Sequence, residues 1–123
     1  MNDRFRFRIP ITNLDGQFDR FIFCDVYHEP IHFIGSAIFL TPEQCTGIKD
    51  KNGNLIYEGD IIRLPWQAGW PDLIGVVKFN ELYASFLLSK TITDRAEQSF
   101  WWNNSKEVIG NIHENPELLE AEK

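Results

Sequence analysis

Two glycine turns, each set between runs of strand-forming residues, constrain the possible folds of this chain more than any other feature. Asp15-Gly16 separates the alternating run RFRFRIPI from FDRFIFCDVY, and Asn52-Gly53 separates GIK from LIY. Alternation places successive side chains on opposite faces of a strand, and Asp-Gly and Asn-Gly favour tight hairpin turns. The chain is therefore predicted to be mainly β and to contain antiparallel hairpins.

Further apolar runs extend this pattern towards the C-terminus. Strands are expected over IHFIGSAIFL, IIRL, IGVVKFN, YASFLLS and KEVIGNIH. Two short helical segments are also predicted. TPEQ, from Thr41 to Gln44, has the residues of a capping box with proline at the first helical position. In ENPELLEAEK, Asn115 as the cap and Pro116 at the first helical position are expected to begin a short acidic C-terminal helix.

The stretch from Cys45 to Leu64, CTGIKDKNGNLIYEGDIIRL, is expected to serve mainly folding. Asn52-Gly53 would fix the register of a hairpin, and Gly59-Asp60 would allow a sharp bend into the next strand. Ile61 and either Ile62 or Leu64 would then enter the core, depending on the register.

The length of the chain suits one compact domain. It has 123 residues, of which 43% are hydrophobic and 14% aromatic, enough to build a core. The boundary between an N-terminal strand unit, residues 1–44, and a small barrel over residues 45–123 is expected near residues 40–44. The two parts can also form one continuous domain.

Charge and cysteine content narrow the classes of function. The formal net charge is -6, whereas proteins that hold a nucleic acid backbone usually present a basic face. Cys24 and Cys45 form neither a C-x-x-C pair nor a disulfide framework. The sequence opens without a secretory leader and lacks an apolar run of about 18 residues. We therefore expect a cytoplasmic protein with free thiols and no association with a membrane.

Two patterns that resemble metal sites fail on geometry. HEPIH, from His28 to His32, matches a zinc-protease motif that requires a helix. Pro30 makes that helix unfavourable by about 3 kcal/mol, and an extended segment would separate the histidines by about 13 Å. DKNGN, beginning at Asp50, resembles a calcium loop, but its glycine comes too early. We predict no metal, cofactor or catalytic residue, and expect that the protein is not an enzyme.

Large aromatic residues in two predicted loops are the main candidates for a binding site. They are Trp66, Trp70, Phe100, Trp101 and Trp102. Such residues are favoured anchors for protein partners, and they also stack on single-stranded bases. The alternative is that they close the open ends of a small barrel or belong to its core. Acidic neighbours, namely Asp72, Asp94 and Glu97, disfavour nucleic acid.

A basic stripe supports a second candidate function. In a strand, Arg4, Arg6 and Arg8 share one face, and with Arg63 and Lys78 they are the candidates for contacting phosphates. The simpler interpretation of RFRFR is an amphipathic strand with a solvated basic face.

Three segments in order resemble one protein family. They are TGIKDKNGNLIYEGDIIR, GVVKF and EVIGNIHENPELLE. The first and last are similar to the T-G-L-K-D-K-N-G, Y-E-G-D and V-I-G-N-I-Y-E-N-P-E-L motifs of the YopX family. Ile48 and His113 stand where the family commonly has Leu and Tyr. RFRIP is only loosely similar to the family's K-F-R-A-W-D opening, so the resemblance covers residues 45–120.

The resemblance implies a phage- or prophage-encoded protein of uncharacterised role, mostly β, with a core similar to an SH3-like barrel and no established catalytic residues. The predicted fold is thus an N-terminal strand unit and a small SH3-like β-barrel with a short C-terminal helix. We expect a non-enzymatic module that binds an unidentified host or phage protein or assembles with copies of itself. The alternative is a nucleic-acid-binding protein in phage gene regulation.

Overall fold

A computed structural model describes residues 6–25, 38–65, 68–90 and 97–120. Arg4, Trp66 and the HEPIH segment lie outside these residues. The elements are β1 (Arg6–Thr12), β2 (Phe18–Asp25), β3 (Ile38–Phe39), β4 (Glu43–Lys49), β5 (Leu55–Tyr57), β6 (Asp60–Leu64), β7 (Leu73–Asn80), β8 (Ser85–Ser89), β9 (Glu97–Gln98), β10 (Glu107–Asn111) and α1 (Glu117–Glu120). The prediction of a mainly β chain is confirmed.

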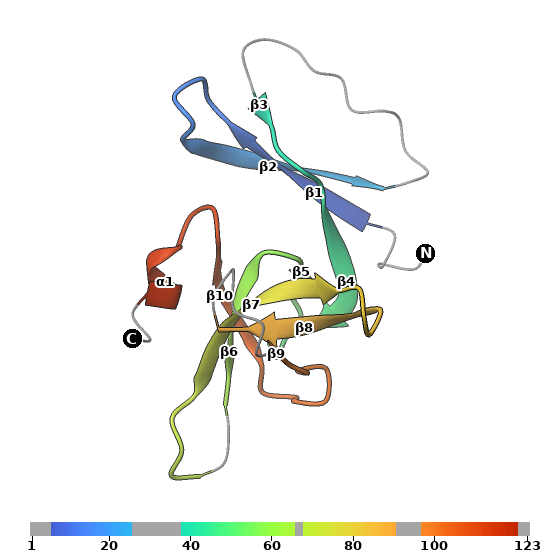
Figure 1. Ribbon diagram of the computed structural model, residues 1–123, viewed down its shortest axis with the longest axis vertical. Helices are drawn as coiled ribbons and strands as arrows, with labels where there is room; N and C mark the ends of the chain where they lie inside the picture. The colour runs from blue at the N-terminus through green and yellow to red at the C-terminus, as the bar shows by residue number, and fades with distance from the viewer. Residues whose placement is uncertain (1–5, 26–37, 66–67, 91–96, 121–123) are drawn as a thin grey trace.

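The strands form two antiparallel sheets of five strands each. The first has the order β2-β1-β4-β5, with β3 also paired to β1, and the second has the order β10-β6-β7-β8-β9. Figure 1 shows the β1–β2 hairpin at one end of the molecule and the second sheet, which curls into half of a barrel, at the other. The two sheets are joined along the chain where β5 turns into β6.

Strand β6 lies at the centre of the core because it is buried on both faces. Ile62 and Leu64 contribute to one cluster of fully buried side chains, while Ile61 packs with Val76 and Leu119 on the other side. The register question left open by the sequence is thus resolved, since both faces of β6 enter a core. The first cluster consists of Ile56, Ile62, Leu64, Val77, Leu88 and Phe100.

The predicted hairpin turns are present, but the first is longer than a two-residue turn. Thr12 pairs with Phe18, so residues 13–17 form the loop. Asn13 builds it, because its Oδ1 accepts hydrogen bonds from the backbone N–H groups of Asp15 and Gln17, each at 3.0 Å. In the second turn, Gly53 has φ = 84°, the left-handed conformation that glycine adopts readily.

The expected helical turn over residues 41–44 is wrong, because strand β4 begins at Glu43. Gln44 pairs with Phe7 of β1, and its carbonyl accepts the N–H of Glu58 at 3.0 Å. Pairing on both sides outweighs a weak local preference for helix. The expected boundary at residue 44 falls inside β4, and the division into two units stays a prediction.

The C-terminal helix is confirmed, although its start differs from the expected cap. The Oδ1 atom of Asn115 accepts the N–H of Asn111 at 3.3 Å, and its carbonyl accepts the N–H of Leu118 at 3.1 Å. Asn115 therefore closes the turn after β10. Leu119 is buried against the Ile61–Val76 face of the curled sheet.

Candidate functional site

The structure divides the candidate aromatic residues into exposed and buried ones. Trp70, Trp101 and Trp102 are 64%, 66% and 46% exposed, whereas Phe100 has no exposed surface. Phe100 is therefore a core residue, and its assignment as an interface candidate is corrected. The exposed area belongs to the tryptophans at 101 and 102, together with Trp70 on the loop between β6 and β7.

The loop that carries the two adjacent tryptophans is held by buried polar contacts. Asn103 donates through Nδ2 to the carbonyl of Pro65 at 2.8 Å. Lys106 is buried, and its Nζ donates to the carbonyls of Asn103 at 2.7 Å and Trp101 at 3.4 Å. Burial lowers the pKa of Lys106, although the charge of Asp50 opposes that shift. The loop therefore presents its tryptophans from a fixed backbone.

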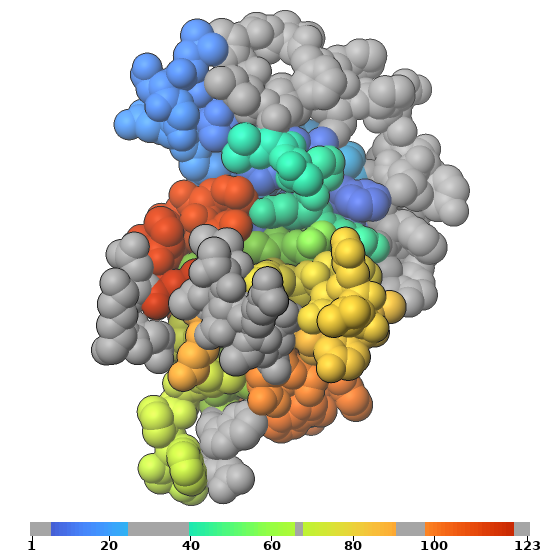
Figure 2. Space-filling model, viewed as in Figure 1, coloured from blue at the N-terminus to red at the C-terminus, as the bar shows by residue number. Residues whose placement is uncertain are grey.

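The tryptophan loop, residues 99–105, lies at the end of the molecule away from the N-terminal hairpin. Figure 2 shows this orange segment and the yellow-green β6–β7 loop on the lower side, with the blue hairpin at the top. The bond from Asn103 to the Pro65 carbonyl joins the bases of these two loops. Sequence reasoning thus identified two loops that meet at one end of the curled sheet.

The structure does not bring the described members of the basic stripe onto one exposed surface. Arg8 is buried, with 5% of its surface exposed, which corrects the prediction of a solvated face. Arg63 is exposed, but its Nη1 lies 3.2 Å from Oε1 of Glu107. Arg6 lines one hollow together with Arg8, whereas Lys78 lines another.

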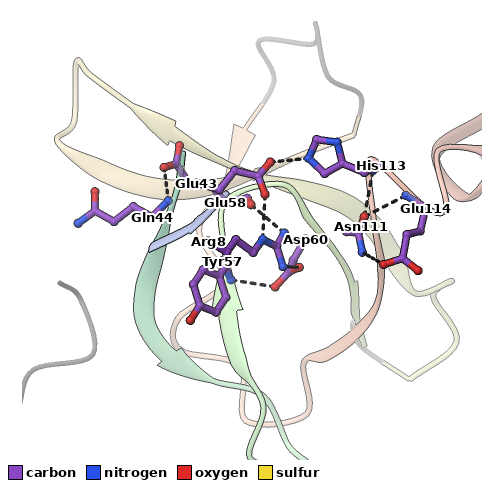
Figure 3. Close-up of polar contacts among 9 residues, drawn as sticks. All are labelled: Arg8, Glu43, Gln44, Tyr57, Glu58, Asp60, Asn111, His113 and Glu114. Atoms are coloured by element: carbon purple, nitrogen blue, oxygen red, sulfur yellow. Dashed lines mark hydrogen bonds and ion pairs between the residues drawn. The ribbon is translucent and has the colours of Figure 1, made fainter. Parts of the chain in front are cut away.

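Arg8 instead forms the centre of a buried charge cluster between the two sheets, which we call the junction (Figure 3). Its Nε lies 2.8 Å from Oε1 of Glu43, and its Nη1 lies 2.7 Å from Oδ1 of Asp60. Its Nη2 donates to the carbonyl of Glu58 at 3.0 Å. One guanidinium thus connects β1, β4 and the β5–β6 turn.

Aromatic rings enclose this cluster. The guanidinium carbon of Arg8 lies 4.2 Å from the ring centre of Phe21 and 5.0 Å from that of Tyr57, within the range of cation–π attraction. His113 places Nε2 2.8 Å from Oε2 of Glu43. Its ring stacks on Phe18 with 5.7 Å between the ring centres. Sequence analysis singled out His113 only as a departure from the family pattern.

Asp60 is the residue of the junction with the clearest shift in pKa. Burial raises its pKa to about 6, although the positive charge of Arg8 and the hydrogen bond from Tyr57 act in the opposite direction. The backbone N–H of Tyr57 donates to its Oδ2 at 2.8 Å. Burial also raises the pKa of Glu58. Such shifts mark functional sites as well as structural ion-pair networks.

Both carboxylate oxygens of Glu43 and both of Asp60 already have a partner on the chain. Glu43 uses one oxygen for Arg8 and the other for His113, and Asp60 uses its two oxygens for Arg8 and the Tyr57 N–H. The geometry therefore suits the cluster to hold the sheets together. In the sequence, only the alternation of RFRFR and the acidic residue in EGD point to this charge cluster. Sequence spacing does not show which strands will pair, so it could not bring these residues together.

A groove of about 730 Å³ opens beside the junction. Its lining includes Leu40, Pro42, Glu43, Lys78, Phe79 and His113. Among the described residues, no group of His, Cys, Asp and Glu is arranged to hold a metal ion. Within the same residues, no helix is long and apolar enough to cross a membrane.

The residues that carried the family resemblance build turns in this structure. Asp50 accepts the N–H groups of Asn52 and Asn54 through Oδ1, each at 2.9 Å, and that of Val108 through Oδ2 at 3.0 Å. Asn111 accepts the N–H groups of His113 and Glu114, each at 3.0 Å. These motifs therefore specify the fold, while the exposed tryptophans lie outside them.

Comparison with known proteins places the chain in a family. No curated protein matches it. Among solved structures, it is similar to the crystal structure of protein EF1440 from Enterococcus faecalis, with 25% identity, coverage of 90% of this chain and 74% of that chain, and a TM-score of 0.46. The family model described as YopX protein matches residues 17–120, a longer range than the predicted 45–120. The chain belongs to the YopX protein family.

Proposed function

We propose that this protein is a non-enzymatic interaction module that binds a protein partner through Trp101, Trp102 and Trp70. The observation that carries the proposal is the exposure of Trp101 and Trp102, 66% and 46%, on a loop with buried anchors. Two adjacent exposed tryptophans leave apolar area in water that a partner would cover. Trp is among the residues most enriched in the energetic centres of protein interfaces.

The tryptophan loop has the preorganisation that favours binding. Phe100 is fully buried directly before the pair, and Lys106 holds the carbonyls of Trp101 and Asn103. A loop already held in one conformation loses less conformational entropy when it binds. Burial of apolar surface contributes about 25 cal/mol per Å², so covering both exposed rings would favour association.

A non-enzymatic role agrees with the chemistry of the junction. Its two carboxylates, Glu43 and Asp60, are already engaged by buried partners on the chain. A general acid or base must instead reach the substrate proton within hydrogen-bonding distance. We also propose that the curled sheet is an SH3-like barrel, and that the protein acts in the cytoplasm as a phage or prophage product.

Nucleic acid binding remains the second candidate function. Exposed tryptophans stack on single-stranded bases, which is the observation in its favour. The burial of Arg8 and the pairing of Arg63 with Glu107 weaken it, because phosphate contacts require accessible cations.

Affinity capture from host lysate, with and without nuclease, tests these functions. The tagged protein is compared with the Trp101→Ala/Trp102→Ala variant and with Leu14→Ala, a control for another exposed apolar residue. We expect the same protein partner after nuclease treatment with wild type and control, and loss of that partner with the tryptophan variant. Capture that depends on nucleic acid would support the second candidate, and unchanged capture by the tryptophan variant would contradict the proposed site.

A further inference from the structure

The turn between β4 and β5 carries a residue pair that is prone to a spontaneous chemical change. Asn52 is exposed and is followed directly by Gly53. In such a pair the backbone nitrogen of the glycine can attack the side-chain carbon Cγ of the asparagine, because glycine has no side chain that hinders the approach. Asparagine is accordingly a thermolabile residue. From the sequence, this pair predicted only a turn.

The reaction needs water as its only co-reactant. The nitrogen of Gly53 loses its proton and forms a bond to Cγ of Asn52, while the bond between Cγ and Nδ2 breaks and ammonia leaves. Water then opens the resulting succinimide ring at either of its carbonyls, which gives aspartate or isoaspartate. Both products replace a neutral amide by a carboxylate, a covalent change that alters the local charge. In isoaspartate the main chain also runs through the former side chain and is one atom longer.

The folded turn has a backbone conformation that disfavours ring closure. The N–H of Gly53 donates to the carbonyl of Asp50 at 3.0 Å. Among the described residues, Ala84 is the only residue other than glycine with a positive φ, so Lys51 and Asn52 have the negative φ angles of a type I turn. The third residue of such a turn, here Asn52, has ψ of about 0°. Ring closure instead requires rotation about its Cα–C bond until the Gly53 nitrogen faces Cγ.

Separate partners also hold the side chain and the backbone of the pair. Nδ2 of Asn52 donates to Oε2 of Glu107 on β10 at 3.4 Å, which directs the side-chain amide towards that strand. Oδ1 of Asp50 accepts the N–H groups of Asn52 and Asn54, each at 2.9 Å, and so fixes the backbone on both sides of the glycine. Burial alone would raise the pKa of Asp50, but three backbone hydrogen bonds lower it. Asp50 is therefore an ionised acceptor at neutral pH.

We propose that Asn52 is a site of spontaneous deamidation that the folded turn protects, so that the reaction marks chains in which this turn has opened. Opening breaks the bond from Gly53 to the Asp50 carbonyl and frees the rotation that ring closure requires. The mark is irreversible, because isoaspartate lengthens the main chain between the two N–H groups that Asp50 binds. The site is separate from the tryptophan loop, and the proposal does not depend on the proposed function.

The rate of deamidation in the folded and the denatured full chain tests the proposal. The purified protein is incubated in buffer and in guanidinium chloride at the same pH and temperature, and peptide mapping by mass spectrometry measures conversion at Asn52. Conversion should be at least about tenfold slower in the folded chain, because opening breaks several hydrogen bonds. Equal rates in the two states would overturn the protection. No conversion in guanidinium chloride, while a synthetic peptide of residues 48–56 reacts there, would overturn the site.

Glu107→Ala tests the contact that holds the Asn52 side chain. The folded-state rate should rise about two- to fivefold, as for the loss of one hydrogen bond, and the rate in guanidinium chloride should not change. Glu107 also pairs with Arg63, so Arg63→Met is the matched control, which removes that ion pair and keeps the bond to Asn52. It should change neither rate. An unchanged folded-state rate in Glu107→Ala, or an equal rise in Arg63→Met, would contradict the role of this contact.

Discussion

The junction and the tryptophan loop each combine aromatic rings with a buried cation, but only the loop exposes its rings to solvent. At the junction, Arg8 is buried between Phe21 and Tyr57 and bound to two carboxylates. In the loop, the buried cation is Lys106, and Trp101 faces solvent. The same residue types therefore stabilise the fold where the rings are enclosed and offer a binding surface where they are not.

The junction and the tryptophan loop also differ in what their buried cation binds. Arg8 is shared by acids from different strands, so its loss would leave charges without a counterion. Lys106 binds backbone carbonyls close to it in sequence, so it supports one loop. Buried ion pairs are weak evidence of net stability, yet removal of one partner is strongly destabilising. The junction should therefore be the more sensitive region.

Arg8→Met should have the largest effect, a loss of about 3–5 kcal/mol in the free energy of unfolding. The substitution keeps an apolar stem of similar length but leaves Glu43 and Asp60 charged and buried. Urea denaturation followed by tryptophan fluorescence measures the change. Arg63→Met is the control, because the exposed pair with Glu107 is worth at most about 1 kcal/mol. Similar losses in both variants would show that the junction is no more sensitive than the surface.

Gly59→Ala should come next, with a loss of about 2–4 kcal/mol that combines backbone strain with a disrupted junction. Gly59 has φ = 86°, and a Cβ atom there would lie 2.5 Å from Oε2 of Glu43, the oxygen that contacts His113. Gly53→Ala is the matched control, since its φ is 84° but no atom lies within 4 Å of the added Cβ. Thermal unfolding of both variants would reveal the difference, and equal changes in Tm would exclude a steric effect at the junction.

The pH dependence of stability should depend on Asp60. Its pKa is raised to about 6 in the folded protein, against about 3.9 in an unfolded chain. Between these values the folded state binds more protons, so stability rises as the pH falls from about 6 to about 4. The contribution is at most about 3 kcal/mol, because one pKa unit corresponds to about 1.4 kcal/mol.

Urea titrations at several pH values measure this dependence in wild type and in Asp60→Asn. The variant should lose the gain in stability on acidification, while other groups, including Glu58, whose pKa burial also raises, titrate in both proteins. The difference between the two curves isolates Asp60. Parallel curves would mean that Arg8 keeps the Asp60 carboxylate ionised throughout this range.

Local signals in the sequence predicted much of the fold. Asn52-Gly53 predicted a turn that is present, because turn residues act on their own neighbours. The predicted C-terminal helix is also present, although the side chain of Asn115 closes the turn before it. TPEQ failed for the opposite reason. Gln44 bonds to Glu58 and pairs with Phe7, and neither partner can be identified from the four residues of the motif.

The candidate site was harder to predict because exposure is a tertiary property. Phe100 and Trp101 are adjacent large aromatics in the sequence, yet one is fully buried and the other is 66% exposed. Arg8 was predicted to lie on a solvated face because alternation shows only to which side of the strand a side chain points. It does not show whether another part of the chain covers that side. The acids that bind Arg8 come from β4 and β6, which are distant in sequence, so no local pattern could have identified the cluster.

Trp101→Ala should have the smallest effect on stability, within about 0.5 kcal/mol, as is usual for an exposed side chain. Phe100→Ala, one position earlier, should cost about 3–5 kcal/mol because it leaves a cavity in the core. Denaturant titration measures both. A large loss of stability in Trp101→Ala would mean that the Trp101 ring stabilises the loop that Lys106 holds. The ring would then serve folding, as the aromatic rings of the junction do. A small loss of stability together with loss of partner capture would mean that the Trp101 ring contributes to binding and that folding does not require it.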